Sequence, residues 1–257
     1  MCRLLAFAAL AGAALIVGCA PSQVRDDRAI FESAFTSLEA GQWQRAIDGF
    51  SQYLRSNPTT PTRGEVYYYR GEALVHLKRA QEAMADFQRA VGAEATQPIL
   101  QFARVAIGNL YYEQGNDAKA VEAYAEVLKG PQEGVPMDML LLRLGVSLQR
   151  MGRWAAADRY LGLVIERYPA TLAAAEARRR YKADSFAVQM GAYSTLSAAQ
   201  QEAERLRAAG YVPRFGTASR NGQTLHTVQV GKARTYAEAQ GLAQGLAESG
   251  FTVLIVP

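Results

Sequence analysis

The chain has 257 residues, of which 49% are hydrophobic, enough for one large or two moderate cores. Its formal net charge is +4 and its pI is about 9.1, but the basic residues are spread out, and the longest basic run is the short stretch 178–182. No basic face with interleaved aromatic residues appears, which argues against nucleic-acid binding.

The N-terminal segment has the features of a signal peptide. Residues 4–17 form an uncharged apolar run that follows Arg3. As a helix this run is about 22 Å long, shorter than the roughly 30 Å hydrocarbon core of a bilayer. It therefore predicts a signal peptide over residues 1–18 rather than a transmembrane helix.

The apolar run ends in Ile-Val-Gly-Cys (16–19), which resembles the lipobox of bacterial lipoproteins. The resemblance implies a diacylglycerol thioether on Cys19 and acylation of the new N-terminus, and several acyl chains anchor a protein stably. The next residue is Ala20 rather than Asp, which in this family implies the periplasmic face of the outer membrane. Residues 19–26 are then a lipidated tether. The alternative is an ordinary secretory signal in which Cys19 is incidental.

A repeat with a step of 37 residues follows. Successive alanines lie 37 residues apart, at Ala46, Ala83, Ala120 and Ala157. Four residues after each alanine comes a large apolar residue: Phe50, Phe87, Tyr124 and Leu161. Twelve residues before each comes a small one: Ala34, Gly71, Gly108 and Gly145. Five residues before each alanine the chain has Gly41, Lys78, Gly115 and Gly152.

This register predicts a helical hairpin in each unit. The small residue allows the second helix to approach closely, a glycine turn joins the two helices, and the large residue is expected to fill the gap between neighbouring hairpins. Residues 129–136 are expected to form a loop between hairpins. The pattern resembles the tetratricopeptide repeat (TPR), which implies an all-α solenoid of about four repeats over residues 27–182, with a concave groove lined by the first helices.

In this family the groove binds a protein partner. The resemblance places six side chains there as candidate contacts: Tyr68, Glu72, Asn109, Tyr112, Leu142 and Gln149. For each of them the alternative is ordinary helix surface or core between repeats. A matched set of Lys and Asn positions that would clamp a peptide's C-terminal carboxylate is not found, which argues against a receptor for chaperone tails.

Residues 184–257 have a different pattern. Strands are expected at 186–191, 211–216, 224–230 and 251–256, and helices at 196–209 and 235–249. Asn221-Gly222 predicts a hairpin between the two halves. The sequence Val-Gln-x-Gly occurs at 188–191 and 228–231, each time where a strand is expected to turn towards a helix. The order predicts a four-stranded antiparallel sheet with both helices on one face, a βαββαβ ferredoxin-like domain. The fold class is therefore α+β with several domains.

This second segment resembles the SPOR domain (the sporulation-related repeat), whose members bind glycan strands of bacterial peptidoglycan. Strand alternation places the glutamines of both motifs on the open face of the sheet. Together, the resemblance and the alternation give a candidate glycan-binding set: Gln189, Arg214, Leu225, Thr227, Gln229 and Ile255. At the family's contact positions Gln189 is retained, whereas Ala192, Leu225 and Thr227 replace a serine, an aromatic residue and an arginine. The alternative is a domain that has lost glycan binding or that binds protein.

Residues for catalysis are not grouped. His76 and His226 lie in different domains, so the sequence indicates neither a zinc cluster nor a Ser/His/Asp triad, and it lacks a phosphate-binding loop. The chain is expected to be a non-enzyme with no cofactor and no metal.

The resulting hypothesis is an outer-membrane lipoprotein with two binding modules. The SPOR domain would bind peptidoglycan, especially septal glycan strands stripped of stem peptides, and the TPR groove would recruit a protein partner in cell division or envelope organisation. The alternative is a repeat scaffold for outer-membrane protein assembly or secretion, in which the SPOR domain is a protein adaptor.

Overall fold

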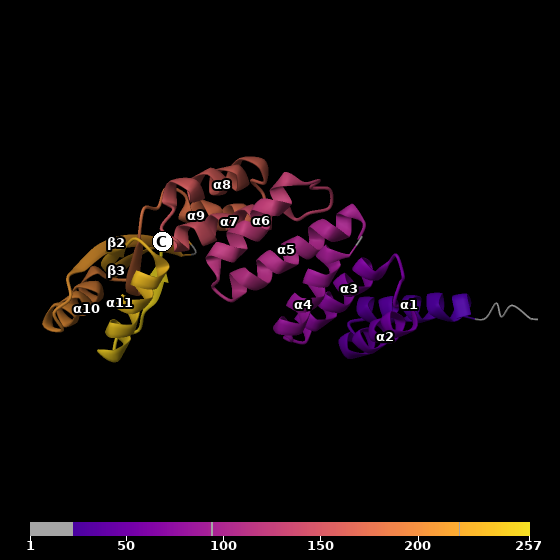
Figure 1. The fold of residues 1–257 in the computed structure, drawn as a ribbon. Coiled ribbons are helices and arrows are strands. Elements are labelled where there is room, and N and C mark those ends of the chain that lie inside the picture. Colours follow the sequence, from indigo (N-terminus) through magenta and orange to yellow (C-terminus); the bar gives the residue numbers. More distant parts are fainter. Residues whose placement is uncertain (1–22, 94, 221) are drawn as a thin grey trace, which may run out of the picture.

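A helical solenoid is joined to a small sheet domain in the computed structural model, which describes residues 23–93, 95–220 and 222–257 (Figure 1). The solenoid contains α1 (Gln23–Glu39), α2 (Trp43–Ser56), α3 (Arg63–His76), α4 (Ala80–Gly92), α5 (Gln97–Glu113), α6 (Asp117–Lys129), α7 (Met137–Arg150), α8 (Trp154–Arg167) and α9 (Leu172–Arg180). The sheet domain contains β1 (Phe186–Tyr193), α10 (Leu196–Ala208), β2 (Pro213–Arg220), β3 (Gln223–Ala233), α11 (Tyr236–Glu248) and β4 (Leu254–Val256).

The predicted signal peptide and Cys19 lie outside the described residues. Helix α1 begins at Gln23, so the last residues of the segment predicted as a tether, 19–26, are helical. Among the helices of the described ranges, none has the length and apolar character needed to cross a bilayer.

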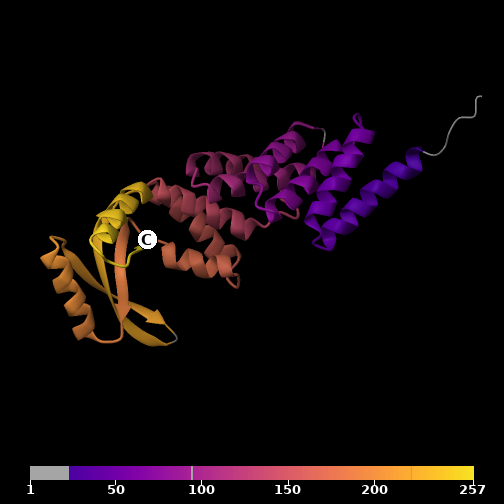
Figure 2. The same cartoon turned by 90° about the horizontal axis from the view of Figure 1, so that it is seen from below.

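Consecutive helices from α1 to α8 pack as hairpins, and the hairpins stack in chain order, with the sheet domain at the end opposite α1 (Figures 1 and 2). The predicted loop is present: α6 ends at Lys129 and α7 begins at Met137. All four repeat alanines are completely buried.

In three of the four hairpins a glycine of the first helix meets a large side chain of the second, whereas in the first hairpin Ala34 meets Gly49. A Cβ atom added to Gly71 would lie 2.6 Å from the ring of Phe87, and one added to Gly108 would lie 2.5 Å from the ring of Tyr124. Such contacts are closer than atoms tolerate, so only glycine permits this helix separation. The prediction placed the large residue between neighbouring hairpins. The structure agrees for Phe50, whose ring lies 6.2 Å from that of Tyr69 on α3 of the next hairpin, while Phe87 and Tyr124 also fill the space over the glycine of their own hairpin.

The turns within the hairpins share one backbone geometry. Their left-handed residues are Gly41, Lys78, Gly115 and Gly152, with φ values of 69°, 59°, 71° and 74°. At the third turn, Gly115 N donates to Tyr112 O at 3.1 Å and Asn116 N donates to Tyr111 O at 2.9 Å, the hydrogen-bond pair of a Schellman motif. The second turn has the same two bonds, so Lys78 adopts a conformation that normally favours glycine.

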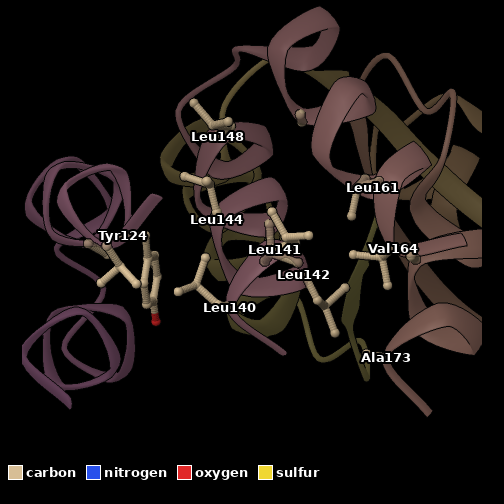
Figure 3. Close-up of a cluster of buried hydrophobic side chains, with 14 of the residues drawn as sticks. Tyr124, Leu140, Leu141, Leu142, Leu144, Leu148, Leu161, Val164 and Ala173 are labelled. Carbon is tan, nitrogen blue, oxygen red and sulfur yellow. The ribbon is translucent and has the colours of Figure 1, made fainter. Parts of the chain in front are cut away.

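Helix α9 closes the solenoid. Its buried residues Ala173, Ala174 and Ala177 pack into the same cluster as the leucines of α7 and Leu161 of α8 (Figure 3). Alanines allow α9 to lie close to both helices. This ninth helix follows the four predicted hairpins and covers the last of them.

The sheet has the strand order β2-β3-β1-β4 with antiparallel pairing, as predicted. Residues of α10 and α11, among them Leu206 and Leu246, pack on Val188, Val228 and Val230 in one core, so both helices cover the same face. Strands β2 and β3 pair antiparallel up to Arg220 and Gln223, as the hairpin prediction requires.

The glycines of the two Val-Gln-x-Gly motifs lie inside strands rather than at their ends, which corrects the prediction. Strand β1 continues past Gly191 to Tyr193, and β3 continues past Gly231 to Ala233. The register between the two strands shifts beside the first motif, and Gly231 has a φ of 80° next to Leu242 of α11. These glycines therefore accommodate irregularities of the sheet.

The two domains are in direct contact through aromatic residues. The indole Nε1 of Trp154, at the start of α8, donates to the carbonyl oxygen of Arg234 at 2.9 Å, and its ring lies 4.8 Å from that of Phe186. The guanidinium of Arg150 lies 4.6 Å from the ring centre of Tyr112 and 5.3 Å from that of Tyr236. The turn between α7 and α8 thus contacts the sheet domain at the start of β1 and between β3 and α11.

The turn geometry generates a stability prediction. Lys78→Gly is expected to raise the free energy of unfolding by about 0.5–1 kcal/mol, because the left-handed conformation costs a non-glycine residue roughly 1–2 kcal/mol and the extra freedom of unfolded glycine offsets part of the gain. Urea unfolding followed by circular dichroism measures the change. Gly115→Ala is the matched reverse variant, since its Cβ meets no atom within 4 Å. It should lose about 1 kcal/mol, and a Lys78→Gly protein no more stable than the parent would contradict the assignment.

Candidate glycan-binding face and partner groove

A row of four side chains crosses the open face of the sheet, one from each strand. Arg214 of β2 pairs with Gln229 of β3, Gln229 pairs with Gln189 of β1, and Gln189 pairs with Leu254 of β4. The amide Nε2 of Gln229 donates to Oε1 of Gln189 at 3.2 Å. The glutamines of the two motifs, forty residues apart in sequence, therefore form one polar unit at the centre of the row.

The ends of this row differ in chemistry. At one end the guanidinium of Arg214 donates to the carbonyl oxygen of Gly231 and remains exposed. At the other end Leu254 is 60% exposed. A sugar chain presents hydroxyl and acetamido groups with apolar ring faces between them. Paired amides, a guanidinium and an aliphatic side chain in line can hydrogen-bond the first and cover the second.

Ile255 is not part of this face, which corrects its assignment to the candidate site. It lies opposite Val188 and packs against the core under the helices. The segment 253–256 is apolar at every position, so its sequence contains no alternation to define which side chains point outward. Pairing with β1 decides this, and it puts Leu254 in the place assigned to Ile255.

Thr227 is only 2% exposed, so the prediction that it contacts a ligand is also wrong. It lies on the open side of the sheet between Gly216 and Ala192, and its hydroxyl points towards Gly216. Leu225, two residues earlier, pairs with Ala218 and is partly exposed. The accessible part of the candidate site therefore consists of the four-residue row, with Leu225 beside it.

Four of the predicted groove residues lie on neighbouring first helices. Tyr68 and Glu72 are on α3, and Asn109 and Tyr112 are on α5, each partly exposed. The ring of Tyr68 lies 6.1 Å from that of Phe102 on α5, which joins the two helices. Burial raises the pKa of the Tyr68 phenol and that of the Glu72 carboxyl. These two groups are poorly solvated on a surface that a partner could cover.

The other two predicted groove residues are buried by α9. Leu142 is 7% exposed and Gln149 is fully buried. The side-chain amide of Gln149 donates to the carbonyl oxygen of Arg180 at the end of α9, at 2.9 Å. The prediction failed because it treated the fourth hairpin like the others, whereas α9 occupies the surface on which a fifth hairpin or a partner would pack.

In the part of the chain that is described, no three His, Cys, Asp or Glu side chains are grouped as a metal site. His76 stacks on Trp43, with ring centres 3.8 Å apart. This contact joins the first two hairpins and gives His76 a packing role.

Comparisons with known proteins agree with both halves of this description. Residues 37–98 match a tetratricopeptide repeat model, residues 102–129 and 140–171 match a second one, and residues 182–257 match the SPOR domain model. Among curated proteins, none matches the chain.

Solved structures resemble the solenoid. A tetratricopeptide repeat protein from Parabacteroides merdae ATCC 43184 is 17% identical with a TM-score of 0.52, and the match covers 60% of this chain and 58% of that one. The chain thus spans less than two thirds of that protein's length. MamA of AMB-1 is also 17% identical, with a TM-score of 0.50, over 61% of this chain and 79% of that one. At this level of identity the likeness shows the fold alone.

The two matched families are binding modules for proteins and for peptidoglycan, which agrees with a non-enzyme of the cell envelope. The chain combines tetratricopeptide repeats over residues 37–171 with a C-terminal SPOR domain over residues 182–257.

Proposed function

We propose that the protein is an outer-membrane lipoprotein that binds peptidoglycan strands lacking stem peptides through the open face of its SPOR domain, and that its TPR groove recruits a protein partner. Such strands form where the septum is split, so the proposed role is in cell division or envelope organisation.

The row from Arg214 to Leu254 is the observation on which the glycan proposal depends. It places one side chain from each strand in line, and the contact between Gln189 and Gln229 leaves donors and acceptors of both amides free for a ligand. Ala192 and Thr227, which replace the family's serine and arginine, pair with each other beside the four-residue row, so the lost polar groups all lie on that one side of the row. Arg214 and Gln229 supply polar groups on the adjacent row.

The membrane part of the proposal is supported by the sequence. The apolar run, the motif at 16–19 and Ala20 together favour lipidation of Cys19 and transfer to the outer membrane. Anchoring at this end and wall binding at the other would hold the solenoid between membrane and wall, because the sheet domain lies at the end opposite α1 (Figure 2).

The partner part of the proposal is supported by the surface of α3 and α5. Tyr68 and Glu72 lie one helical turn apart there, and partial burial raises the pKa of both groups, so a partner that covers them would remove little further water from them. Asn109 is less available, since its Oδ1 accepts a hydrogen bond from the hydroxyl of Tyr124 at 2.8 Å. The proposed contact surface is therefore centred on Tyr68 and Glu72.

Wall binding is tested by co-sedimentation of the full chain with purified peptidoglycan, before and after an amidase removes the stem peptides. Stronger pelleting with amidase-treated wall is expected. The double variant Gln189→Ala, Arg214→Ala should bind at least tenfold more weakly, because two groups that hydrogen-bond the ligand are lost.

The matched control is Gln200→Ala, Arg207→Ala, which removes the same residue types from the exposed surface of α10. It should bind like the parent. Equal binding of the two double variants would refute the open face as the site, and absence of pelleting with either wall would favour the scaffold alternative.

The lipid anchor is tested by Cys19→Ala. This variant should move from the membrane fraction to the periplasmic fraction, because its attachment depends on acyl chains that it can no longer receive. Cys2→Ala is the control and should remain membrane-bound. A Cys19→Ala protein that still pellets with membranes would contradict lipidation at this residue.

The state of Glu72 predicts a pH-dependent stability difference. Its pKa is raised in the folded protein, so ionisation costs stability once the pH rises above the pKa that the carboxyl has in the unfolded chain. Glu72→Gln should therefore stabilise the protein at pH 7, and the gain should shrink at pH 4, where the carboxyl is largely protonated. Thermal unfolding at the two pH values measures this. Glu122→Gln, at an exposed position of α6, should change little at either pH.

A further inference from the structure

A pocket of about 570 Å³ lies at the junction of the two domains. One wall is the turn before α8 and the first turn of that helix, including Arg153 and Trp154. The other wall comes from the SPOR domain and includes Asp184, Lys232 and Arg234. Neither domain forms this pocket alone.

The pocket has an excess of positive charge. Lys232 pairs with Asp184 at 2.9 Å, and both side chains are largely exposed. The side chains of Arg153 and Arg234 are exposed and form no hydrogen bond or ion pair with any residue in the described ranges. Three cations thus line the pocket with one carboxylate. The first turn of α8 adds its helix dipole to the positive potential that these side chains create.

The backbone on both sides of the pocket is fixed by contacts that do not involve the cationic side chains. Trp154 donates its indole hydrogen bond to the backbone of Arg234 and packs on Phe186, and the amide of Arg234 donates to Glu238 at 2.8 Å. The backbone that bears the cations is therefore fixed before a ligand arrives, which lowers the entropy cost of binding.

The pocket lies at the ends of β1 and β3, beside the open-face row. The guanidinium of Arg214, the end of that row, donates to the carbonyl oxygen of Gly231, and Lys232 is the next residue of β3. A ligand that leaves the row at Gln229 and runs along β3 would bring its next group to Lys232 and the pocket.

Removal of stem peptides changes the charge of the glycan. In intact peptidoglycan the lactyl carboxyl of muramic acid is bound in an amide to the stem peptide. Hydrolysis of that amide leaves a free carboxylate attached directly to the sugar. The stem peptides carry carboxylates too, but on chains that extend away from the sugar.

We propose that the junction pocket is a subsite for the lactyl carboxylate of denuded glycan, bound by Arg153, Lys232 and Arg234. The inference depends on the proposed binding of glycan to the open face. The subsite would explain selectivity for strands without stem peptides, because the lactyl carboxylate is free only after the peptide has been removed. One of the three cationic side chains that would bind it, Arg153, belongs to the solenoid rather than to the SPOR domain.

The test uses the full chain and three forms of purified peptidoglycan: intact, amidase-treated, and amidase-treated with its carboxylates converted to neutral amides. The parent protein should bind the amidase-treated wall best, and neutralising the carboxylates should weaken that binding about tenfold. The variant Arg153→Gln, Lys232→Gln, Arg234→Gln should bind the amidase-treated wall about tenfold more weakly than the parent and should not distinguish it from the neutralised wall. The preference of the parent should also vanish in about 1 M salt, where the Debye length is about 3 Å.

The charge-matched control is Arg45→Gln, Arg55→Gln, Lys119→Gln, three exposed positions of the solenoid outside the pocket. It should behave like the parent on all three walls. Binding of the junction variant that equals the parent's, or that falls by the same factor on every wall, would overturn the carboxylate subsite while leaving glycan binding intact. A parent protein that pellets with none of the walls would instead contradict the proposed function itself.

Discussion

The close approach of the two helices in each hairpin, at a glycine under a large side chain in three hairpins and at Ala34 and Gly49 in the first, is the constraint on which the structure depends. Where glycine is present, the second helix approaches until an aromatic ring or a leucine fills the space over it, as Phe87 does over Gly71. The repeat alanine is then completely buried at the crossing. Since the four hairpins share one turn geometry and one buried alanine position, successive hairpins stack with a similar orientation and produce a solenoid.

The solenoid in turn determines where the SPOR domain lies. Helix α9 covers the fourth hairpin with alanines, and the chain leaves it only a few residues before β1. Trp154 then binds the backbone at Arg234, and Arg150 lies between Tyr112 and Tyr236. A tryptophan hydrogen bond and cation–π contacts give this junction specificity that a flexible linker would lack. The proposed partner groove and the proposed glycan-binding face are therefore held in a defined relation, and the pocket at the junction contains residues of both domains.

The sequence predicted most of the fold because its signals were local and repeated. A fixed step of 37 residues identified the hairpins, and helix-ending glycines such as Gly210 and Gly250 limited the helices of the SPOR domain. At position 78 the repeat pattern predicted the turn correctly although the residue is not glycine, since Lys78 adopts the left-handed conformation that glycine has in the other units. Signals failed where the local sequence was uniform. The apolar run 253–256 does not indicate which side chains face outward. In the structure it is Leu254, not Ile255, that lies on the open face.

The sequence by itself determined the repeat, the order of strands and helices, and the placement of Gln189 and Gln229 on the open face of the sheet, because each follows from the periodicity of helices or strands. Tertiary structure alone decided which of these positions are accessible. Burial of Leu142 and Gln149 depends on α9, and burial of Thr227 depends on its neighbours across the sheet. The sequence did not indicate the junction pocket either, since Arg153 and Lys232 are far apart along the chain and come together only where the two domains pack against each other.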